Sequence, residues 1–448
     1  MEGLEIQEFN LASILKHENI RLEAEFYTSQ TELFSEYFLG KDIIKSCTYN
    51  SIYGMNAEGK GYPAIRMNEF DGLFTGKPTQ FSHNFLLEDF KKHQLKENDI
   101  LICRTNGNPN LVGKSALVMI DEPYVYESHL FKIQPKQEII NSHTLATYLN
   151  CKYGKQEIFR YSMQGNQSNF SLAKFKEMKI PKFSSALQKD IKILISSSFE
   201  KLQKSKEAYQ AAQDLLLDHL GLKDFNLPAQ AVNVKSFSDS FGRSGRLDAE
   251  FYQEKYEGYL KKIQAYPYGC EPIRTACKLK DANYTPKDNQ TYRYIELSNI
   301  GNLGEITGAS LDLGCNLPSR ARRKVSKNDV IISSIEGSLA SCAIVSEQYH
   351  QALCSTGFYV VSSKKINSET LLMLFKSEPI QQLLKQGCSG TILTAINKDE
   401  FLNIPLPLVD ANIQTQIADL IRQSDRLRQE SQALLEEAKR KVEQAIEG

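Results

Sequence analysis

The sequence is duplicated, and this feature constrains the fold of its 448 residues more than any other. Residues 21–27 (RLEAEFY) recur as residues 246–252 (RLDAEFY), 225 positions later. Residues 98–102 (NDILI) recur as residues 328–332 (NDVII), 230 positions later. Further matches follow in the same order, namely Asn141 with Asn367 and the Ile-Pro pairs at 180–181 and 404–405. We therefore interpret the chain as two tandem copies of a unit of about 225 residues, much longer than the period of a solenoid repeat.

Each copy begins with a part that is rich in short strands. Residues 100–103 and 330–333 are short apolar runs with β-branched side chains, and residues 117–120 and 343–345 follow them as candidate return strands. Gly, Asn and Pro residues between these runs predict turns. We expect this part of each copy to be a compact, strand-rich α/β domain.

Each copy ends in a stretch with the pattern of a long helix. Residues 185–220 and 411–446 contain no Gly or Pro, and a helix of this length would span about 54 Å. Apolar residues at helical spacing form one face of each stretch: Ile191, Ile195, Leu202, Tyr209 and Leu216 in the first, and Ile417, Leu420, Leu427, Leu434, Ala438 and Val442 in the second. We expect the two helices to pack against each other as a coiled coil; the alternative is that each packs only on its own domain. Four serines lie near these faces, at positions 198, 205, 424 and 431, so the helices are expected to approach closely.

The predicted fold class is α+β. Two similar strand-rich α/β domains are expected, separated by a pair of long antiparallel coiled-coil helices in a pseudo-two-fold tandem repeat. Residues 2–10 (EGLEIQEFN) resemble residues 220–226 (LGLKDFN), so the N-terminal segment is expected to close a cyclic arrangement. The predicted boundaries are 1–20 for that segment, 21–182 for the first domain, 183–221 for the first helix, 222–245 for a linker, 246–407 for the second domain and 408–448 for the second helix.

Charge and cysteine content limit the classes of protein. Lys plus Arg and Asp plus Glu both number 54, and this balance excludes a uniformly basic nucleic-acid binder. The net charge is +5 over residues 41–182 and +2 over residues 267–407, so a phosphate-facing surface is expected on the globular domains. The nine cysteines include no C-x-x-C pair, which indicates reduced thiols rather than a disulfide framework or a zinc site. No run of 18 apolar residues occurs. We therefore expect a cytoplasmic protein without a membrane span or a bound metal.

The motifs of common catalytic sites are incomplete in this sequence. Residues 107–115 (GNPNLVGKS) have five residues between Gly107 and the Gly-Lys pair, where a phosphate-binding loop has four. Residues 121–124 (DEPY) differ by one residue from the DPPY motif of amino-methyltransferases, and no glycine-rich cofactor turn accompanies them. The seven histidines do not correspond between the two copies. Two domains without a matching acid, base or nucleophile favour binding over catalysis.

Polar loops and basic clusters are the candidate binding groups. Arg can pair with guanine, Asn or Gln with adenine, and Glu with cytosine in the major groove of DNA. In the first copy the candidates are Lys91, Lys92, Arg104, Asn106, Asn108, Lys114, Gln164, Asn166 and Gln167. In the second copy they are Arg320, Arg322, Arg323, Ser333, Glu336, Thr391 and Thr394. The alternative is that the charges form a solvated surface and the loop residues only make turns.

Taken together, these marks resemble the specificity subunits of Type I restriction–modification systems over essentially the whole chain. They are the RLEAEFY and RLDAEFY openings, the Asn-Asp strands followed by Gly, the Ile-Pro exits at 180–181 and 404–405, and the long helix after each exit. The family usually has Gly-Asp where this chain has Asn98-Asp99 and Asn328-Asp329. The resemblance carries over no base specificity, because recognition loops differ most between family members.

The resemblance implies a non-catalytic subunit with two target-recognition domains, each reading one half of a bipartite site on double-stranded DNA. It implies that the helices set the gap between the half-sites and dock two methyltransferase subunits, and that motor–nuclease subunits join the full complex. No cofactor is expected on the chain itself, since S-adenosylmethionine and ATP would be bound by the partner subunits only.

Two alternatives remain open from the sequence. One is a specificity subunit of a related system, whose partner both methylates and cleaves DNA. The other is a coiled-coil adaptor whose domains bind protein. The effect of salt distinguishes the adaptor, because phosphate contacts make affinity fall steeply with salt concentration whereas an apolar protein interface barely responds.

Overall fold

The chain forms two compact units in a computed structural model, and each is described separately. The first unit comprises Met1–Leu202 with Gln429–Gly448, and the second comprises Gln203–Arg428. The structure describes residues 34–49, 54–83, 87–162, 168–223, 225, 232–390 and 394–448. The predicted closing segment 1–20 and the first RLEAEFY motif lie outside these residues. Each unit contains one globular part and a portion of both long helices, so the unit boundary falls within the helices and not at their ends.

The globular part of the first unit is strand-rich, as predicted. Its strands are β1 (Tyr37–Leu39), β2 (Ile44–Tyr49), β3 (Tyr62–Ile65), β4 (Phe70–Asp71), β5 (Phe74–Thr75), β6 (Gln80–Ser82), β7 (Ile100–Cys103), β8 (Thr105–Asn106), β9 (Ser115–Leu117), β10 (Val125–Tyr126), β11 (Leu130–Pro135), β12 (Ser168–Asn169) and β13 (Lys179–Pro181). Its helices are α3 (Gly40–Ile43), α4 (Leu87–His93), α5 (Ser142–Asn150), α6 (Lys152–Tyr161) and α7 (Leu172–Glu177). The main sheet has the order β2-β11-β7-β9-β5-β4, and a smaller one has the order β10-β3-β6.

The globular part of the second unit repeats this plan. Its strands are β14 (Cys270–Pro272), β15 (Lys278–Leu279), β16 (Thr291–Ile295), β17 (Ser310–Leu313), β18 (Ala321–Lys324), β19 (Val330–Ser333), β20 (Cys342–Ile344), β21 (Leu353–Ser355), β22 (Phe358–Ser362), β23 (Cys388–Ser389), β24 (Ala395–Ile396) and β25 (Pro405–Pro407). Its helices are α9 (Phe241–Ser244), α10 (Glu254–Gln264), α11 (Ile273–Ala276), α12 (Ser368–Lys376), α13 (Glu378–Gln386) and α14 (Lys398–Asn403). The sheet β15-β22-β19-β20 corresponds to β2-β11-β7-β9 of the first unit.

The repeated Asn-Asp sequences occupy the same tight turn in both units. Asn98 and Asn328 have φ angles of 70° and 67°, in the left-handed region that Asn tolerates better than most residues with a side chain. The next residue is a buried aspartate in both units, and its carboxylate accepts the N–H three residues earlier, at Lys96 for Asp99 and at Ser326 for Asp329. The backbone conformation explains why Asn can stand here where the family usually has Gly.

A glutamine network connects each globular part to a long helix. In the first unit Gln188 accepts the N–H of Asn141 at 2.8 Å, and Asn141 caps α5. In the second unit Gln414 accepts the N–H of Asn367 at 2.8 Å, and Asn367 caps α12. The identical bonding in both units shows that the duplication extends to side-chain contacts.

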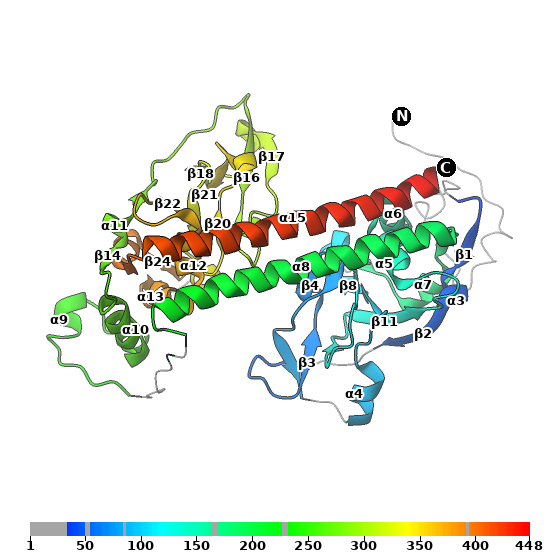
Figure 1. The fold of residues 1–448 in the computed structure, drawn as a ribbon, viewed down its shortest axis with the longest axis horizontal. Coiled ribbons are helices and arrows are strands. Elements are labelled where there is room, and N and C mark those ends of the chain that lie inside the picture. Colours follow the sequence, from blue (N-terminus) through cyan, green and yellow to red (C-terminus); the bar gives the residue numbers. More distant parts are fainter. Residues whose placement is uncertain are drawn as a thin grey trace. The chain divides into compact units, whose positions relative to one another are not determined.

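The two long helices are α8 (Ser185–His219) and α15 (Ala411–Glu447), close to the predicted ranges. In both units a stretch of α8 runs antiparallel to a stretch of α15 (Figure 1). The hydroxyls of Ser198 and Ser431 donate to each other's carbonyls at 2.9 and 2.8 Å in the first unit. Ser205 and Ser424 do the same at 2.7 Å in the second. These reciprocal bonds require closely spaced backbones, as the serine positions predicted.

The buried seam of α15 differs by one position from the predicted one. All five apolar residues predicted for α8 are buried, and so are Ile417 and Val442 of α15. Leu420, Leu427 and Leu434 are only half-buried and border the seam. Ser424, Ser431 and Ala438 are buried in the seam as expected, and Ile421, the residue after Leu420, is buried there as well. The three leucines therefore lie at the edge of the seam.

Candidate nucleic-acid interface

In the first unit, the strands that border the two predicted polar loops are paired. β8 and β12 run antiparallel, with Asn106 opposite Ser168 and Thr105 opposite Asn169. The N–H of Phe170 donates to the carbonyl of Arg104 at 2.8 Å. Three of the predicted recognition residues, Gln164, Asn166 and Gln167, lie outside the described residues. The pairing therefore joins the 104–108 loop to the segment that follows the other loop.

Arg104 is half-buried and stands over an aromatic ring. Its guanidinium carbon lies 5.5 Å from the ring centre of Tyr49, a distance at which a cation–π interaction operates. The hydroxyl of Tyr49 accepts the N–H of Leu172 at 2.6 Å, which fixes the ring beside the loop. Burial raises the pKa of Tyr49, so the ring stays neutral. Tyr49 therefore supports the predicted recognition residue Arg104, and this role was not predicted because Tyr49 belongs to no recognised motif.

The two predicted asparagines of this loop shape its backbone. The side-chain oxygen of Asn106 accepts the N–H of Asn108 at 2.8 Å. The side-chain oxygen of Asn108 accepts the N–H of Asn110 at 3.0 Å and caps a short turn at Pro109–Leu111. The turn-forming alternative therefore applies to both oxygens. Lys114, at the end of the loop, is half-buried, and this burial lowers its pKa.

In the second unit, the equivalent loops are also adjacent. Ile335 forms a β-bridge with Ala395. The N–H of Glu336 donates to the carbonyl of Thr394 at 3.0 Å. Glu336 and Thr394 are both half-buried, and Thr391 lies outside the described residues. The same pair of loops is thus brought together at the same place in each unit, with different side chains on it.

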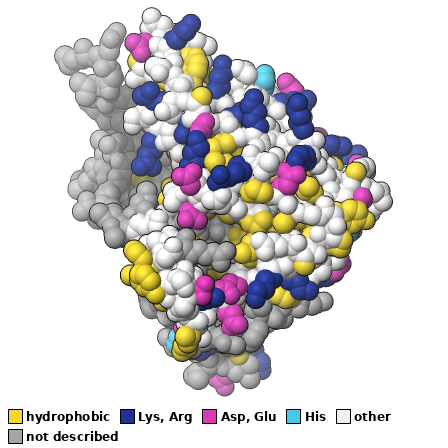
Figure 2. Space-filling model, turned by 90° about the vertical axis from the view of Figure 1, so that its left-hand side faces the viewer, with side chains coloured by type: hydrophobic (Ala, Val, Ile, Leu, Met, Phe, Trp, Pro, Cys, Tyr) yellow, Lys and Arg dark blue, Asp and Glu magenta, His cyan; other side chains and the backbone are white. Residues whose placement is uncertain are grey.

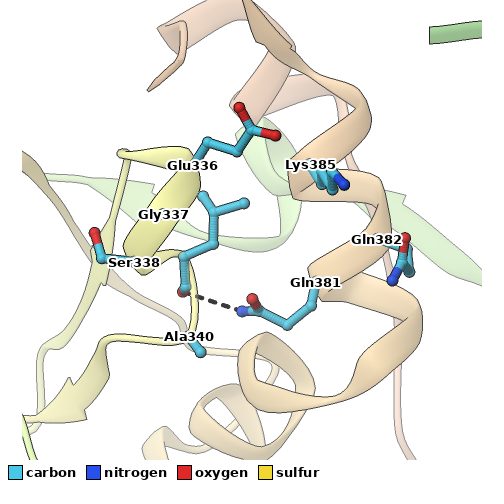
Figure 3. A pocket seen from close by; sticks show the side chains of 8 residues that line it. Glu336, Gly337, Ser338, Ala340, Gln381, Gln382 and Lys385 are labelled. Carbon is cyan, nitrogen blue, oxygen red and sulfur yellow. Dashed lines mark hydrogen bonds between the residues drawn. The ribbon is translucent and has the colours of Figure 1, made fainter. Parts of the chain in front are cut away.

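A pocket of about 220 Å³ lies beside Glu336. Residues 336–340 form one wall, and Gln381, Gln382 and Lys385 of α13 line the rest (Figure 3). The side-chain amide of Gln381 donates to the carbonyl of Leu339 at 3.1 Å and holds the loop against the helix. These three α13 residues were not predicted, because polar residues at helical spacing do not indicate a pocket.

The prediction that Ser333 contacts a ligand is wrong for this structure. Ser333 is fully buried at the end of β19, where all four side chains are buried. Its hydroxyl lies 2.8 Å from that of Ser338 and accepts the N–H of Ile335 at 3.1 Å. Ser333 therefore stabilises the turn into the loop and offers no atom to the surface.

The predicted basic cluster of the second unit divides between surface and interior. Arg320 is exposed, and Arg322 is half-buried with its Nε donating to the carbonyl of Ser319 at 3.0 Å. Arg323 follows on β18, whose pairing with β21 is irregular between Ala321 and Arg323. One terminal nitrogen of Arg323 is buried and has no hydrogen-bond partner in the described part of the chain. Its positive charge helps to lower the pKa of Asp281, after the larger effect of Lys398. Arg320 and Arg322 are therefore better placed than Arg323 for a surface contact.

The corresponding basic residues of the first unit are at the surface. Lys91 and Lys92 lie in the last turn of α4 and are both exposed. For the second unit, whose elements lie on the side of Figure 1 that faces the viewer in Figure 2, Lys and Arg side chains gather toward the top of the face, with Asp and Glu scattered among them. Basic residues that project into solvent are the groups that contact phosphate in nucleic-acid complexes.

The described residues contain no cluster of three or more side chains suited to a metal ion. None of their helices is both long enough and apolar enough to cross a membrane.

Comparison with known proteins gives a family match in both copies. A family model described as the Type I restriction modification DNA specificity domain matches residues 38–208 and 273–440. A search of curated proteins found no match.

Solved structures give matches over almost the full length. The S subunit of a Type I restriction–modification system from M. genitalium is 13% identical, with a TM-score of 0.41, over 91% of this chain and 95% of that one. An HsdS subunit from Thermoanaerobacter tengcongensis is 12% identical, with a TM-score of 0.29, over 90% and 96% of the two chains. A chain from a study of the assembly and conformational transition of a Type I system is 14% identical, with a TM-score of 0.28, over 90% and 97%.

Proposed function

The chain belongs to the Type I restriction–modification DNA specificity family, and on this premise we propose that it is the DNA-recognition subunit of such an enzyme. Each globular domain reads one half of a bipartite target on double-stranded DNA. The chain itself is non-catalytic and cytoplasmic and binds no cofactor. Methylation and cleavage are carried out by partner subunits, which bind S-adenosylmethionine and ATP.

The observation that carries this proposal is the matched pair of loops. In both units the same backbone pairing brings two polar loops together, through β8 and β12 in the first and through the Ile335–Ala395 bridge in the second. The side chains at equivalent positions of the shared scaffold differ, since Arg104 corresponds to Ser334 and Asn106 corresponds to Glu336. Arg pairs with guanine and Glu accepts from cytosine in the major groove. A common scaffold with different base-pairing groups is suited to reading two different half-sites.

The helices α8 and α15 set the gap between the half-sites in this proposal. Each is a single uninterrupted helix of 35 or 37 residues. The serine pairs are seven residues apart on both helices, so one antiparallel register is kept along them. A heptad spacing of this kind is typical of coiled coils, which act as rigid spacers.

Two methyltransferase subunits dock on the chain in this proposal, and motor–nuclease subunits join them. Exposed apolar side chains support a protein partner, because a large exposed apolar patch commonly marks an interaction surface. Val232, Val234, Phe237 and Leu247 of the second unit are all at least 70% exposed. They lie in the segment between α8 and α10, outside the candidate DNA-reading loops.

Methylation mapping tests the proposed function. The chain would be co-expressed with the methyltransferase subunit encoded beside it, and N6-methyladenine would be mapped across the genome of the expression host. Two short defined sequences around a fixed undefined gap are expected. A stable complex with an active methyltransferase but no methylated motif would contradict the proposal and favour the protein-binding adaptor. A motif produced by a partner that also cleaves DNA would indicate the related system with a fused methyltransferase–nuclease.

A further inference from the structure

The repeated motif RLDAEFY at residues 246–252 has no role in the proposed function so far, yet its arginine is held in one conformation. Arg246 donates from Nε and Nη2 to the two carboxylate oxygens of Asp248 at 2.7 and 2.6 Å. Its guanidinium stands 4.4 Å from the ring centre of Phe251. The hydroxyl of Tyr252 donates to the carbonyl of Arg246 at 2.9 Å. Arg246, Asp248, Phe251 and Tyr252 thus form a closed unit that aims the arginine.

The arginine is aimed at the start of the loop predicted to read DNA. Nη2 of Arg246 donates to the carbonyl of Cys388 at 3.0 Å, and Nη1 donates to the carbonyl of Gln386 at 3.5 Å. Gln386 is the last residue of α13, where helix carbonyls lack intrahelical partners and a cation is favoured by the helix dipole. The side chain of Gln386 returns a bond to the carbonyl of Phe251 at 2.9 Å. Arg246 therefore fixes the end of α13 and the first residue of β23 together.

The hairpin β23–β24 is held on both of its strands. Arg246 contacts β23 at Cys388, which is paired with Ile396 of β24. On β24, the N–H of Ile396 donates to the carbonyl of Ser334 at 2.8 Å, and Ala395 bridges to Ile335. A shift of Arg246 would release one of these two supports and leave the other.

We propose that Arg246 is a positioning residue for specificity, which holds the β23–β24 hairpin in register for DNA reading by the second domain without touching DNA itself. This inference rests on the proposed function. The carboxylate of Asp248 is paired with the guanidinium, which lowers the pKa of Asp248 and neutralises the charge that a phosphate would need. The motif occurs once in each copy of the chain, and the first, at residues 21–27, lies outside the described residues.

The test uses the complex assembled with its methyltransferase and DNA duplexes altered in one half-site at a time. Arg246→Ala and Asp248→Ala remove opposite charges but break the same support. Both are expected to reduce discrimination at the half-site read by the second domain by roughly tenfold, since one wrong base pair costs about 1–3 kcal/mol. The other half-site and the salt dependence of binding should stay unchanged. Arg246→Lys keeps the charge without the paired geometry and should fall between wild type and Arg246→Ala.

Arg274→Ala is the matched control, since Arg274 is an exposed arginine of the same unit that bonds to Asn403 and not to the hairpin. It should leave discrimination at both half-sites unchanged. The melting temperature of each complex shows that the variants are folded.

Four results would overturn the inference. Arg246 would be shown to contact phosphate if Arg246→Ala lowered DNA affinity equally on all sequences and weakened its salt dependence, while Asp248→Ala raised DNA affinity. Equal relaxation of both half-sites would show a general defect and no local positioning. If the wild-type complex is sequence-specific and the variants discriminate as well as it does, only the positioning role is refuted. A wild-type complex without any half-site preference would refute the proposed function as well.

Discussion

Replacing Gln414 with alanine removes the contact that joins the start of α12 to the start of α15 in the second unit. The side chain of Gln414 is almost fully buried. Its oxygen accepts the N–H of Asn367 at 2.8 Å, and its amide donates to the carbonyls of Lys365 and Val409 at 3.0 and 2.8 Å. Three hydrogen bonds are therefore lost together, of which the bond to Val409 is buried and the other two are part-buried.

The expected loss of local stability follows from these three bonds. One neutral hydrogen bond contributes about 0.5–1.5 kcal/mol, and a buried partner left unpaired costs about 1–3 kcal/mol. We expect Gln414→Ala to destabilise its unit by about 3 kcal/mol, which is roughly a hundredfold in the opening equilibrium.

Hydrogen exchange measures this loss separately in each unit, which a single unfolding transition of a chain with two units would not. Amides of α12 should exchange roughly a hundredfold faster in Gln414→Ala, while those of α5 remain protected. Gln188 makes the same three bonds in the first unit, to Asn141, Ile139 and Phe183. Gln188→Ala should therefore give the opposite pattern. Faster exchange in both units of either variant, or in neither, would refute the reasoning that two equivalent and independent networks exist.

Three further predictions concern recognition, spacing and pH. Arg104→Ala should relax specificity in one half-site only, at a cost of about 1–3 kcal/mol in competition binding, whereas equal loss on every sequence would identify a phosphate contact. Inserting one heptad into both α8 and α15 between the serine pairs lengthens each helix by about 10 Å. Methylation mapping should then show a gap between the half-sites that is about three base pairs longer, or no recognition. An unchanged gap would contradict the spacer role. Burial lowers the pKa of His143 to about 4 from the ordinary 6.5. Between these pH values the unfolded chain binds more protons than the folded one. The stability of the first unit should therefore rise as pH rises through this window, by up to about 1.4 kcal/mol for each pH unit. His143→Leu should flatten that rise in hydrogen exchange measured at several pH values, and an equally steep rise would assign it to other groups.

The sequence predicted the existence and extent of the helices better than their packing. The lack of Gly and Pro over residues 185–220 and 411–446 located both helices to within about a residue, because breakers mark helix ends strongly. The search for large apolar residues then selected Leu420, Leu427 and Leu434 for the seam of α15. The seam instead contains Ile421, Ser424, Ser431 and Ala438, and small side chains at three of these positions let the backbones come close enough to bond through serine.

The candidate interface was predictable in position and less so in atomic detail. Loops that follow equivalent strands were expected to occupy equivalent places, and the pairing of β8 with β12 agrees with this expectation. The bounds of β19 were predicted correctly, but Ser333 was misplaced because all four side chains of this strand are buried, and a polar residue at the end of a strand does not indicate burial. The contact of Arg246 with Gln386 joins residues 140 positions apart, and no local pattern reports such a distance.

The way the two copies differ in their cores indicates where base contacts should be sought. The buried carboxylate of Asp99 is paired with Lys132 of β11 at 3.1 Å. In the second copy, the residue in register with Lys132 is Val360, and Asp329 is paired instead with Lys280 at 2.7 Å. A buried carboxylate needs a paired cation, and a lysine from either of two segments can supply it. The core of the duplicated domain has therefore kept its interactions while exchanging the residues that make them. The loops have kept their backbone pairing and not their side-chain interactions, since Arg104 lies over Tyr49 whereas Ser334, at the equivalent position, donates to the carbonyl of Gly357. This second kind of difference agrees with the proposal that the two domains read different half-sites. Some loop positions have the same backbone pairing in both copies but different side chains. Substitutions at these positions should therefore change DNA specificity without loss of stability.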